Sequence, residues 1–557
     1  MKAFYKLVPL IFVIAVLAGC SMGEELATIR LSLGQAETAR AVSLSDVSHT
    51  VTLSGPTGSK TAEIGPGGGS VSFAVAPGTW NISVTAYYQG EVYATGSATA
   101  EVKAGKTTSV SVQMTVVYME APTFPTDLRP LLSAQGFDLN IASDFYSLIC
   151  VEGSLVWAYA EPGSATPILG TEDFTWQWNV NGTPVKAGVD PLYPNEYEVQ
   201  PGDVDKNVTV TVTHPDYQGS VTLGPVLVCR GLDSINWPAF ADQLGSPKFP
   251  DDGNYVLLED ISTLTPGTIV GGFLAPFNGT FDGNGNTIDL VINSWTMDGY
   301  MGLFALIGPS GTVKNLNINA EINVTSIPSD TFYFGAVAGK NQGKIFNVFV
   351  RLNPSGINIV DTGSNFTAYI GGIAGWNENA ISNCSVDGTS SLTGIFAQKN
   401  TSPAPLRAGG IVGWNAGTVH HCWTLGVNVN CQGSYLGTSS GSIAGNSDTS
   451  IQNCVAIGPS DITGTDYSQA GRIWGTGNGI GSDNNYSDVD VTQTSSPVSG
   501  GLSSNRDGED IAPTLAYNVE SWWTDTAGWD SVWGGWDADE AKPWYWGYYN
   551  MPSLWFN

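Results

Sequence analysis

The order of hydrophobic and polar residues predicts β-strands along most of the chain. Hydrophobic residues alternate with small polar ones in VSFAV at 71–75, in WNISVTAYY at 80–88 and in NVTVTVT at 207–213. Successive side chains of a strand point to opposite faces, so this alternation is typical of strands with one buried face. A short helix is expected in NWPAFADQL at 236–244. The pattern therefore predicts an all-β protein.

Turn signals divide the N-terminal half into two small antiparallel β-sandwiches, expected at 30–118 and 137–230. In the second, Asn181-Gly182 follows the alternating segment FTWQWNV, which is typical of a two-residue hairpin turn. Residues 119–136 contain three prolines and are expected to form a semi-rigid linker. The first sandwich resembles immunoglobulin- or transthyretin-like modules, and the second resembles immunoglobulin-like modules.

The C-terminal half contains an internal repeat. Five glycine-framed apolar segments recur: GAVAG at 335, GGIAG at 371, GGIVG at 409, GSIAG at 441 and GRIWG at 471. Repeats of this length are too small to bury a hydrophobic face alone, so we expect them to stack and share one core.

Stacking makes a definite prediction about equivalent side chains. Two inward columns are expected, one of Ile373, Ile411 and Ile443 and one of Cys384, Cys422 and Cys454. Asparagine recurs directly before the inward residue at this position of the repeat, at 315, 347, 383 and 453. Asparagine tolerates the left-handed backbone conformation that a tight corner requires.

These repeats resemble the GLUG motif, and the resemblance covers roughly residues 255–480. GLUG repeats occur in bacterial surface proteins, including the non-catalytic part of some immunoglobulin A-cleaving metallopeptidases. The resemblance implies a right-handed parallel β-helix, expected here at 231–495. The helix at 236–244 is a candidate to cover one end of the stack, and the Trp-rich residues 496–557 are expected to form a C-terminal cap on the other.

The N-terminus begins MKAFYKLVPLIFVIAVLAGC, in which two lysines precede an apolar run. The run is shorter than the roughly 20 residues that a spanning helix needs, and it suits a secretory signal. Its end resembles the lipobox of bacterial lipoproteins, which implies a signal peptide at 1–19, lipidation of Cys20 and a tether at 20–29. An ordinary signal peptide with a chance cysteine is the alternative. The protein is therefore expected in the cell envelope, held to a membrane by its lipid, at the outer membrane or the cell surface.

The charge of the chain excludes one class of partner. The formal net charge is −29, from 21 basic and 50 acidic residues. Such a chain repels the phosphate backbone, so nucleic-acid binding is not expected.

Several cysteines and acidic residues are candidates for chemical sites. Cys150 and Cys229 lie near the two ends of the second sandwich and are a candidate disulfide, with two buried free thiols as the alternative. The repeated cysteines, with His420 and His421, do not suit a metal, because side chains spaced by about 4.8 Å per strand cannot converge on one tetrahedral ion. Their redox state, and that of Cys431, stays open. DGNGN at 282–286 favours a structural turn over a calcium loop, although a bound Ca²⁺ also stays open.

No catalytic residue, cofactor or metal ligand is predicted. The acidic residues Asp282, Asp289 and Asp298 share no repeat position, and the chain contains no H-E-x-x-H motif. Trp376 and Trp414 follow equivalent repeat segments and are candidates either to stack on a ligand's sugar ring or to stack on each other.

The sequence therefore favours a non-catalytic surface lipoprotein that displays a GLUG β-helix for adhesion or ligand binding. The expected ligand is a glycan or a protein of a host or cell surface. The alternative is a carbohydrate-active enzyme, a polysaccharide lyase or glycosidase, on the same scaffold.

Overall fold

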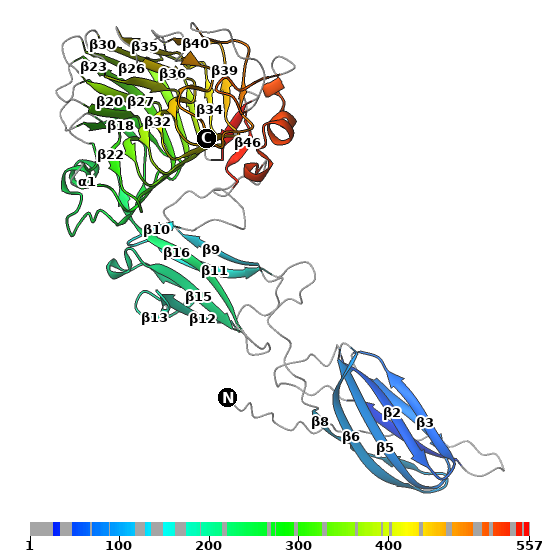
Figure 1. Ribbon diagram of the computed structural model, residues 1–557. Coiled ribbons are helices and arrows are strands. Elements are labelled where there is room, and N and C mark those ends of the chain that lie inside the picture. The colour runs from blue at the N-terminus through cyan, green and yellow to red at the C-terminus, as the bar shows by residue number, and fades with distance from the viewer. Residues whose placement is uncertain are drawn as a thin grey trace. The chain divides into compact units, whose positions relative to one another are not determined.

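A computed structural model gives the arrangement of the chain, which is almost entirely β-structure (Figure 1). The strands form two compact units, the first built on β1 to β8 and the second on β9 to β47. The all-β prediction is confirmed. The structure describes residues 26–33, 47–66, 69–88, 90–116, 129–134, 149–161, 174–189, 191–213, 220–264, 269–272, 275–293, 299–325, 331–361, 366–391, 394–399, 404–433, 438–463, 470–493, 504–511, 516–534, 542–547 and 551–555.

The first unit is a sandwich of two sheets with one shared core. One sheet has the strand order β3-β2-β5-β6-β8 and the other β4-β1-β7. Trp80 is fully buried between them, and Gly55 makes room for it, because a Cβ at Gly55 would lie 2.3 Å from the indole. The strands are β1 (Ala27–Leu33), β2 (Val47–Gly55), β3 (Gly58–Ile64), β4 (Gly69–Val75), β5 (Gly78–Tyr88), β6 (Glu91–Val102), β7 (Thr107–Ser109) and β8 (Gln113–Val116).

The second unit begins with strands that come before and after a hairpin turn in the sequence. Asn181 and Gly182 have φ of 45° and 74°, so the predicted hairpin turn is confirmed. The alternation before it is also confirmed, since Trp178 and Val180 are buried on one face. The elements are β9 (Arg129–Ala134), β10 (Ile149–Val151), β11 (Leu155–Glu161), β12 (Thr175–Val180), β13 (Thr183–Pro184), β14 (Glu196–Glu198), the 3-10 turn η3 (Pro201–Asp203), β15 (Asn207–Thr213) and β16 (Val221–Leu232).

Strand β16 joins these strands to the repeats. It pairs in parallel with β10 at Leu227 and with β17 (Asn254–Leu257) at Arg230, so one sheet runs from the hairpin region into the repeats. The boundary expected between residues 230 and 231 therefore lies inside a continuous strand.

The repeats stack as rungs, each of which passes through three parallel sheets (Figure 1). The first narrow sheet contains β21 (Tyr300–Met301), β24 (Thr331–Gly335), β27 (Thr367–Gly371), β31 (Leu406–Gly409), β36 (Thr438–Gly441) and β41 (Ala470–Gly471). The second narrow sheet contains β22 (Phe304–Ile307), β25 (Ala338–Asn341), β28 (Ala374–Asn377), β32 (Val412–Asn415), β37 (Ala444–Ser447) and β42 (Trp474–Thr476).

The third sheet, here the large sheet, is the continuation of β16. Its strands in the repeats, after β17, are β18 (Ile261–Leu264), β19 (Thr280–Asp282), β20 (Thr287–Ile292), β23 (Thr312–Val324), β26 (Lys344–Asp361), β29 (Ala380–Asp387), β30 (Ile395–Lys399), β33 (Thr418–His420), β34 (Trp423–Leu425), β35 (Val429–Gly433), β38 (Ile451–Gln452), β39 (Val455–Ile457), β40 (Ser460–Thr463), β43 (Tyr486–Ser487), β44 (Val491–Gln493) and β45 (Glu509–Asp510).

The predicted inward columns are confirmed. Ile373 donates its backbone N–H to Ile411 at 2.9 Å, Ile411 donates to Ile443 at 3.0 Å, and all three side chains are fully buried. The three repeated cysteines are buried in the same core. Equivalent residues therefore lie one above another, which explains why the sequence repeats.

The predicted left-handed corners are also confirmed. Asn315, Asn347, Asn383 and Asn453 have φ between 52° and 56°. His421, with φ of 52°, occupies the equivalent place in the rung between Asn383 and Asn453.

A helix covers the N-terminal end of the stack, as the sequence predicted. Helix α1 (Trp237–Gln243) buries Trp237 and Phe240 completely. Trp237 packs edge-on against Phe281, and Phe240 packs against Tyr255, so aromatic rings fill the first rungs.

The Trp-rich segment does not simply close the last rung, which corrects the sequence prediction. Arg506 extends the stack, since its carbonyl accepts the N–H groups of Ile473 and Trp474 at 2.8 and 3.0 Å. The later tryptophans instead pack against side chains of the outer face of the large sheet. Figure 1 shows the red ribbon of this segment beside that sheet. The elements of this segment are η5 (Ala516–Asn518), the π-turn η6 (Trp522–Thr526), η7 (Asp530–Val532), β46 (Trp544–Trp546) and β47 (Pro552–Leu554), of which η6 and β46 contain tryptophans.

The physical reason is the composition of that outer face. It carries unlike apolar side chains in neighbouring rungs, with Trp423 in register with Val455 and Leu425 in register with Ile457. Burying them against the tryptophans removes apolar area from water. The face contributes Phe349, Trp423, Leu425, Val455 and Ile457 to this cluster.

Candidate functional site

Aromatic and basic side chains form two columns on the outside of the narrow sheets. One column consists of Tyr300, Tyr333 and Tyr369, whose rings stack at 4.9 and 5.3 Å. The other contains Trp376 and Trp414, which stack at 4.8 Å with planes 4° apart. The register of parallel strands places each ring on its equivalent in the next rung.

The two columns contact each other and include two cations. Tyr333 stacks against Trp376 at 5.3 Å. Lys340 lies in the column of Trp376, with its Nζ 4.0 Å from the centre of that indole, and Arg407 lies 4.9 Å from the centre of Trp414. We call these residues the aromatic–basic strip: Tyr300, Tyr333, Lys340, Tyr369, Trp376, Arg407 and Trp414.

Acidic neighbours balance the charges of the strip. Lys340 forms an ion pair with Glu378 at 2.9 Å. The indole N–H of Trp414 donates to Asp448 at 2.7 Å. Apart from Tyr369, the side chains of the strip are partly exposed, so the strip combines an ordered aromatic stack with accessible charges.

Burial governs the ionisation of the strip. It raises the pKa of the Tyr300, Tyr333 and Tyr369 hydroxyls, so these groups are neutral hydrogen-bonding groups at neutral pH. Burial also lowers the pKa of Arg407, because the guanidinium has lost part of its water. The electron-rich faces of Trp414 and Tyr369 compensate by attracting the cation.

The structure shows how the two candidate ligand-stacking residues lie. Trp376 has Trp414 stacked on it and Lys340 over its ring, while Trp414 has Trp376 stacked on it and Arg407 over its ring. A sugar ring stacks on an exposed aromatic face. A ligand at this strip would therefore meet ring edges, tyrosine hydroxyls and the two cations before it met a free face.

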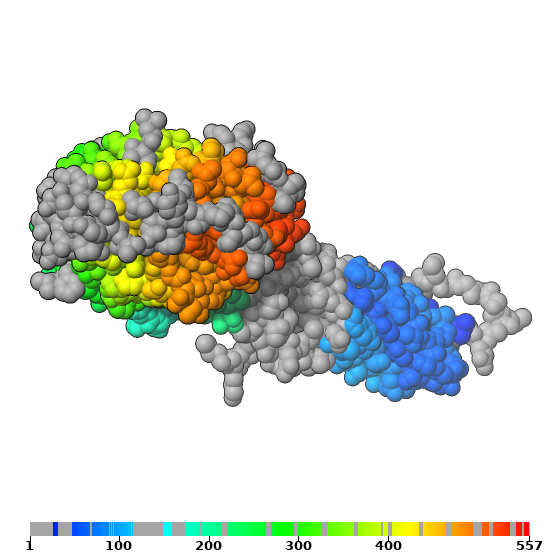
Figure 2. All heavy atoms as spheres, turned by 45° about the horizontal axis from the view of Figure 1, so that its top comes forward, coloured from blue at the N-terminus to red at the C-terminus, as the bar shows by residue number. Residues whose placement is uncertain are grey.

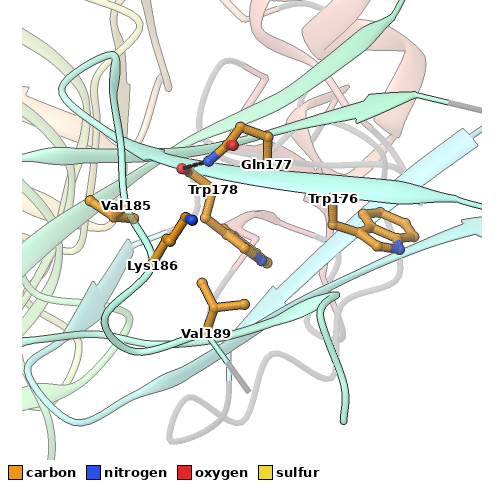
Figure 3. A pocket seen from close by; sticks show the side chains of 6 residues that line it. All are labelled: Trp176, Gln177, Trp178, Val185, Lys186 and Val189. Atoms are coloured by element: carbon orange, nitrogen blue, oxygen red, sulfur yellow. Dashed lines mark hydrogen bonds between the residues drawn. The ribbon is translucent and has the colours of Figure 1, made fainter. Parts of the chain in front are cut away.

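The other candidate site is a hollow beside the predicted hairpin (Figure 3). It has a volume of about 260 Å³ and is lined by Trp176, Gln177, Trp178, Val185, Lys186 and Val189. Trp178 is almost completely buried, and its indole N–H donates to the carbonyl of Pro194 at 3.0 Å. Its lining has one exposed charge and few convergent polar groups, so it is the weaker candidate for ligand binding.

Cys150 and Cys229 lie on neighbouring strands. Strands β10 and β16 pair in parallel, with Val151 opposite Cys229, and both cysteines are buried free thiols. Burial raises the pKa of Cys150 to about 12, so this thiol is protonated and unreactive at neutral pH. In the structure the pair has the alternative form, two buried free thiols, and not the predicted disulfide.

The repeated cysteines and the two histidines do not converge on a common point. Cys384, Cys422 and Cys454 follow one another along the stack, and burial raises the pKa of Cys422 and Cys454. No group of three or more His, Cys, Asp or Glu residues suited to a metal ion occurs among the described residues.

The acidic residues considered for catalysis have structural partners where they are described. Asp282 forms an ion pair with Lys314 at 3.2 Å and accepts hydrogen bonds from Asn315, and Asp289 accepts one from Asn319. Asp298 and the predicted lipidation site Cys20 lie outside the described residues. Among the described residues, no helix is long and apolar enough to cross a membrane.

Sequence reasoning found the tryptophans of the strip but missed its other members. Tyr333, Tyr369 and Arg407 precede the glycine-framed segments by a few residues, and Lys340 occupies the place that Trp376 has one rung later. Aligning the residues before each repeat would have revealed the tyrosine column. Its contact with the tryptophan column depends on how the two narrow sheets meet.

The rung that contains Tyr369, Trp376 and Cys384 also has a counterpart in known proteins. Residues 367–391 match the GLUG motif. This match covers strands β27, β28 and β29, that is, one pass through all three sheets.

One curated relative is similar over a short segment. A protein of Evansella cellulosilytica named as a Gly-rich membrane protein is 38% identical over 77 residues, which are 14% of this chain. The matching segment spans 9% of that relative's length. The GLUG motif and this relative are consistent with a surface protein.

Proposed function

We propose that this protein is a non-catalytic, lipid-anchored protein of the bacterial cell envelope that displays its repeats for adhesion or ligand binding. In this proposal the rungs coil as a right-handed parallel β-helix, and the lipid at Cys20 holds the protein at the outer membrane or cell surface. The GLUG match, the membrane-protein relative and the lipobox-like N-terminus support the location.

The aromatic–basic strip is the observation that supports ligand binding. It places two cations and three neutral tyrosines on the outside of a chain whose net charge is −29. Hydroxyls, ammonium and guanidinium groups donate hydrogen bonds. The strip therefore suits a ligand rich in acceptor oxygens, such as a glycan with carboxylate groups or an acidic protein segment.

The anchor is tested by replacing the predicted lipidated cysteine. Cys20→Ser replaces the thiol that accepts the lipid with a hydroxyl. Lipidation should be lost, because a hydroxyl is a much weaker nucleophile. Metabolic labelling with an acyl probe should label the natural protein and not the variant. Continued labelling of Cys20→Ser would contradict lipidation at this residue.

Ligand binding is tested on glycan and protein arrays with the unlipidated full chain. The variant Lys340→Gln/Arg407→Gln removes both charges of the strip and should lose the array signals of its ligand. Lys186→Gln, at an exposed position of the hollow beside the hairpin, serves as the matched control. Binding that survives in the double variant and is lost in the control would place the ligand site at the hollow instead.

A further inference from the structure

The left-handed asparagines form a column with a direction. The amides of three residues donate toward the preceding rung: Asn315 to Asp282 at 3.2 Å, Asn347 to Asn315 at 3.1 Å, and Asn484 to Asn453 at 2.7 Å. A column of this kind is satisfied only while each member can both donate and accept.

His421 interrupts the column. Its Nε2 lies 3.1 Å from Nδ2 of Asn453. Because Oδ1 of Asn453 already accepts from Asn484, the amide nitrogen of Asn453 must be the donor and Nε2 of His421 the acceptor. The histidine is therefore neutral, with its Nε2 free of a proton.

The C-terminal segment docks at this interruption. The indole N–H of Trp544 donates to Oδ1 of Asn383 at 3.4 Å, on the side of the column where His421 offers no amide. Trp529 packs edge-on against the His421 ring, with ring centres 5.9 Å apart, and its indole N–H donates to the Asn453 carbonyl at 2.9 Å.

The fit between the segment and the column is close. A Cβ at Gly528, where φ is 75°, would lie 2.4 Å from the side-chain nitrogen of Asn484. That nitrogen also donates to the carbonyl of Ala527 at 2.9 Å. His421, Asn453 and Asn484 thus form one hydrogen-bonded path that ends on the backbone of the C-terminal segment.

We propose that His421 is a proton-sensitive latch, and that its protonation releases the Trp-rich residues 516–534 and 542–547 from the outer face of the large sheet. A proton on Nε2 faces the N–H groups of Asn453, so two donors oppose each other. Asn453 can turn its oxygen toward the histidine only by giving up the hydrogen bond from Asn484, which in turn holds Ala527. Figure 2 shows the red C-terminal residues beside orange residues of the stack.

The charged surroundings of His421 are few. On its own element, Nδ1 of His420 lies 3.1 Å from Nδ1 of His421, and a charge on His420 opposes a charge on His421. The backbone of Gly528 in the C-terminal segment offers His421 a hydrogen bond that raises its pKa and so offsets part of the effect of burial. From the next rung, His421 faces the neutral amide of Asn453. Among the described residues, no carboxylate contributes to the shift of the His421 pKa.

The direction of the pH effect follows from the docked and free states. Burial, reinforced by His420, lowers the pKa of His421 from 6.5 to about 4 in the docked state. Docking is therefore strongest above pH 6.5, weakens as the pH falls through the range between these two values, and levels off below about 4. The docking equilibrium should fall by a factor of up to about 300 across that range.

Hydrogen exchange of the full chain tests this proposal. Protection factors, which correct for the intrinsic pH dependence of exchange, are measured between pH 7 and 4.5 for the amides of Ala527 and Trp529, both bonded within the segment. They should fall as the pH drops, while the amide of Ile411 in the core stays protected.

The variant His421→Asn supplies the matched control, because asparagine is the residue of the equivalent corners. It should complete the column and make protection of the segment independent of pH over this range. A His421→Asn variant with the pH dependence of the natural protein would overturn the latch. Loss of Ile411 protection together with that of the segment would also overturn it, because the whole stack would then be opening.

Discussion

The repeat stack has two outer surfaces that carry large aromatic side chains, and it stabilises them in different ways. On the narrow sheets, tyrosines and tryptophans recur at equivalent positions and stack on their own copies, as Trp376 does on Trp414. On the large sheet, side chains of different shape follow one another, as Phe349 and Ser385 or Trp423 and Val455 do, and a separate segment packs against them.

The difference shows what repetition contributes to a surface. In-register stacking lets a side chain use the next rung as its partner, so no additional chain is needed. It also leaves ring edges and the accompanying cations partly exposed. Where the side chains differ from rung to rung, their apolar area must be buried by another segment, and that surface is closed for as long as the segment stays docked.

A charge in the shared core should disrupt both surfaces together, with the largest effect. Ile411→Asp buries a carboxylate without a partner among apolar side chains, which costs several kcal/mol. Limited proteolysis should show cleavage throughout the stack, while the first sandwich stays resistant. Thr418→Asp, at an exposed position of the same rung, is the control and should change little. Equal resistance of both variants would mean that Ile411 does not support the rungs.

Removing the central tryptophan of the covering segment should affect only the covered surface. Trp529 is fully buried, so Trp529→Ala should destabilise docking by about 3–5 kcal/mol. Hydrogen exchange should then increase in residues 516–534 and leave the narrow sheets protected. Trp546→Ala, at a half-buried position, is the comparison and should have a smaller effect. Loss of protection in the narrow sheets would show that the two surfaces are coupled.

Truncating the stacked column should have a smaller effect than truncating the segment. Trp414→Ala removes the stacking on Trp376 and the contact with Arg407, worth about 1–2 kcal/mol together. Thermal unfolding should reveal the loss, and Trp414→Phe should recover part of it by keeping an aromatic ring. A Trp414→Phe variant as unstable as Trp414→Ala would indicate that the hydrogen bond to Asp448 matters more than stacking.

The smallest effect is expected from the cation at the other end of the tryptophan column. Lys340→Met keeps most of the aliphatic chain and removes the charge that contacts Trp376 and Glu378, worth about 0.5–1 kcal/mol. Added salt should reduce the difference in melting temperature between this variant and the natural protein. A difference that does not respond to salt would assign the contact to packing.

The sequence predicted the repeating parts of the fold well, because the spacing of equivalent residues shows which of them pair between neighbouring rungs. Ile373 and Ile411 lie where their spacing placed them, and the asparagines have the left-handed conformation expected of them. The hairpin at Asn181-Gly182 was equally predictable, since its two residues need no distant partner to favour the turn.

The sequence did not predict where the tryptophans of the C-terminal segment lie. Their density suggested a cap, and the structure places Trp523, Trp529 and Trp544 along the side of the stack. A count of aromatic residues shows that they must be buried, but it does not show which surface buries them.

What the sequence determined by itself is therefore the local and the periodic: the strands, the tight corners, the inward columns and the short helix α1 at the N-terminal end of the stack. The tertiary structure alone decided the contact between the tyrosine and tryptophan columns and the docking of the C-terminal segment on the asparagine column. The physical reason is separation along the chain. Trp544 and Asn383 are 161 residues apart, and no local preference of either residue selects the other until the rungs have stacked.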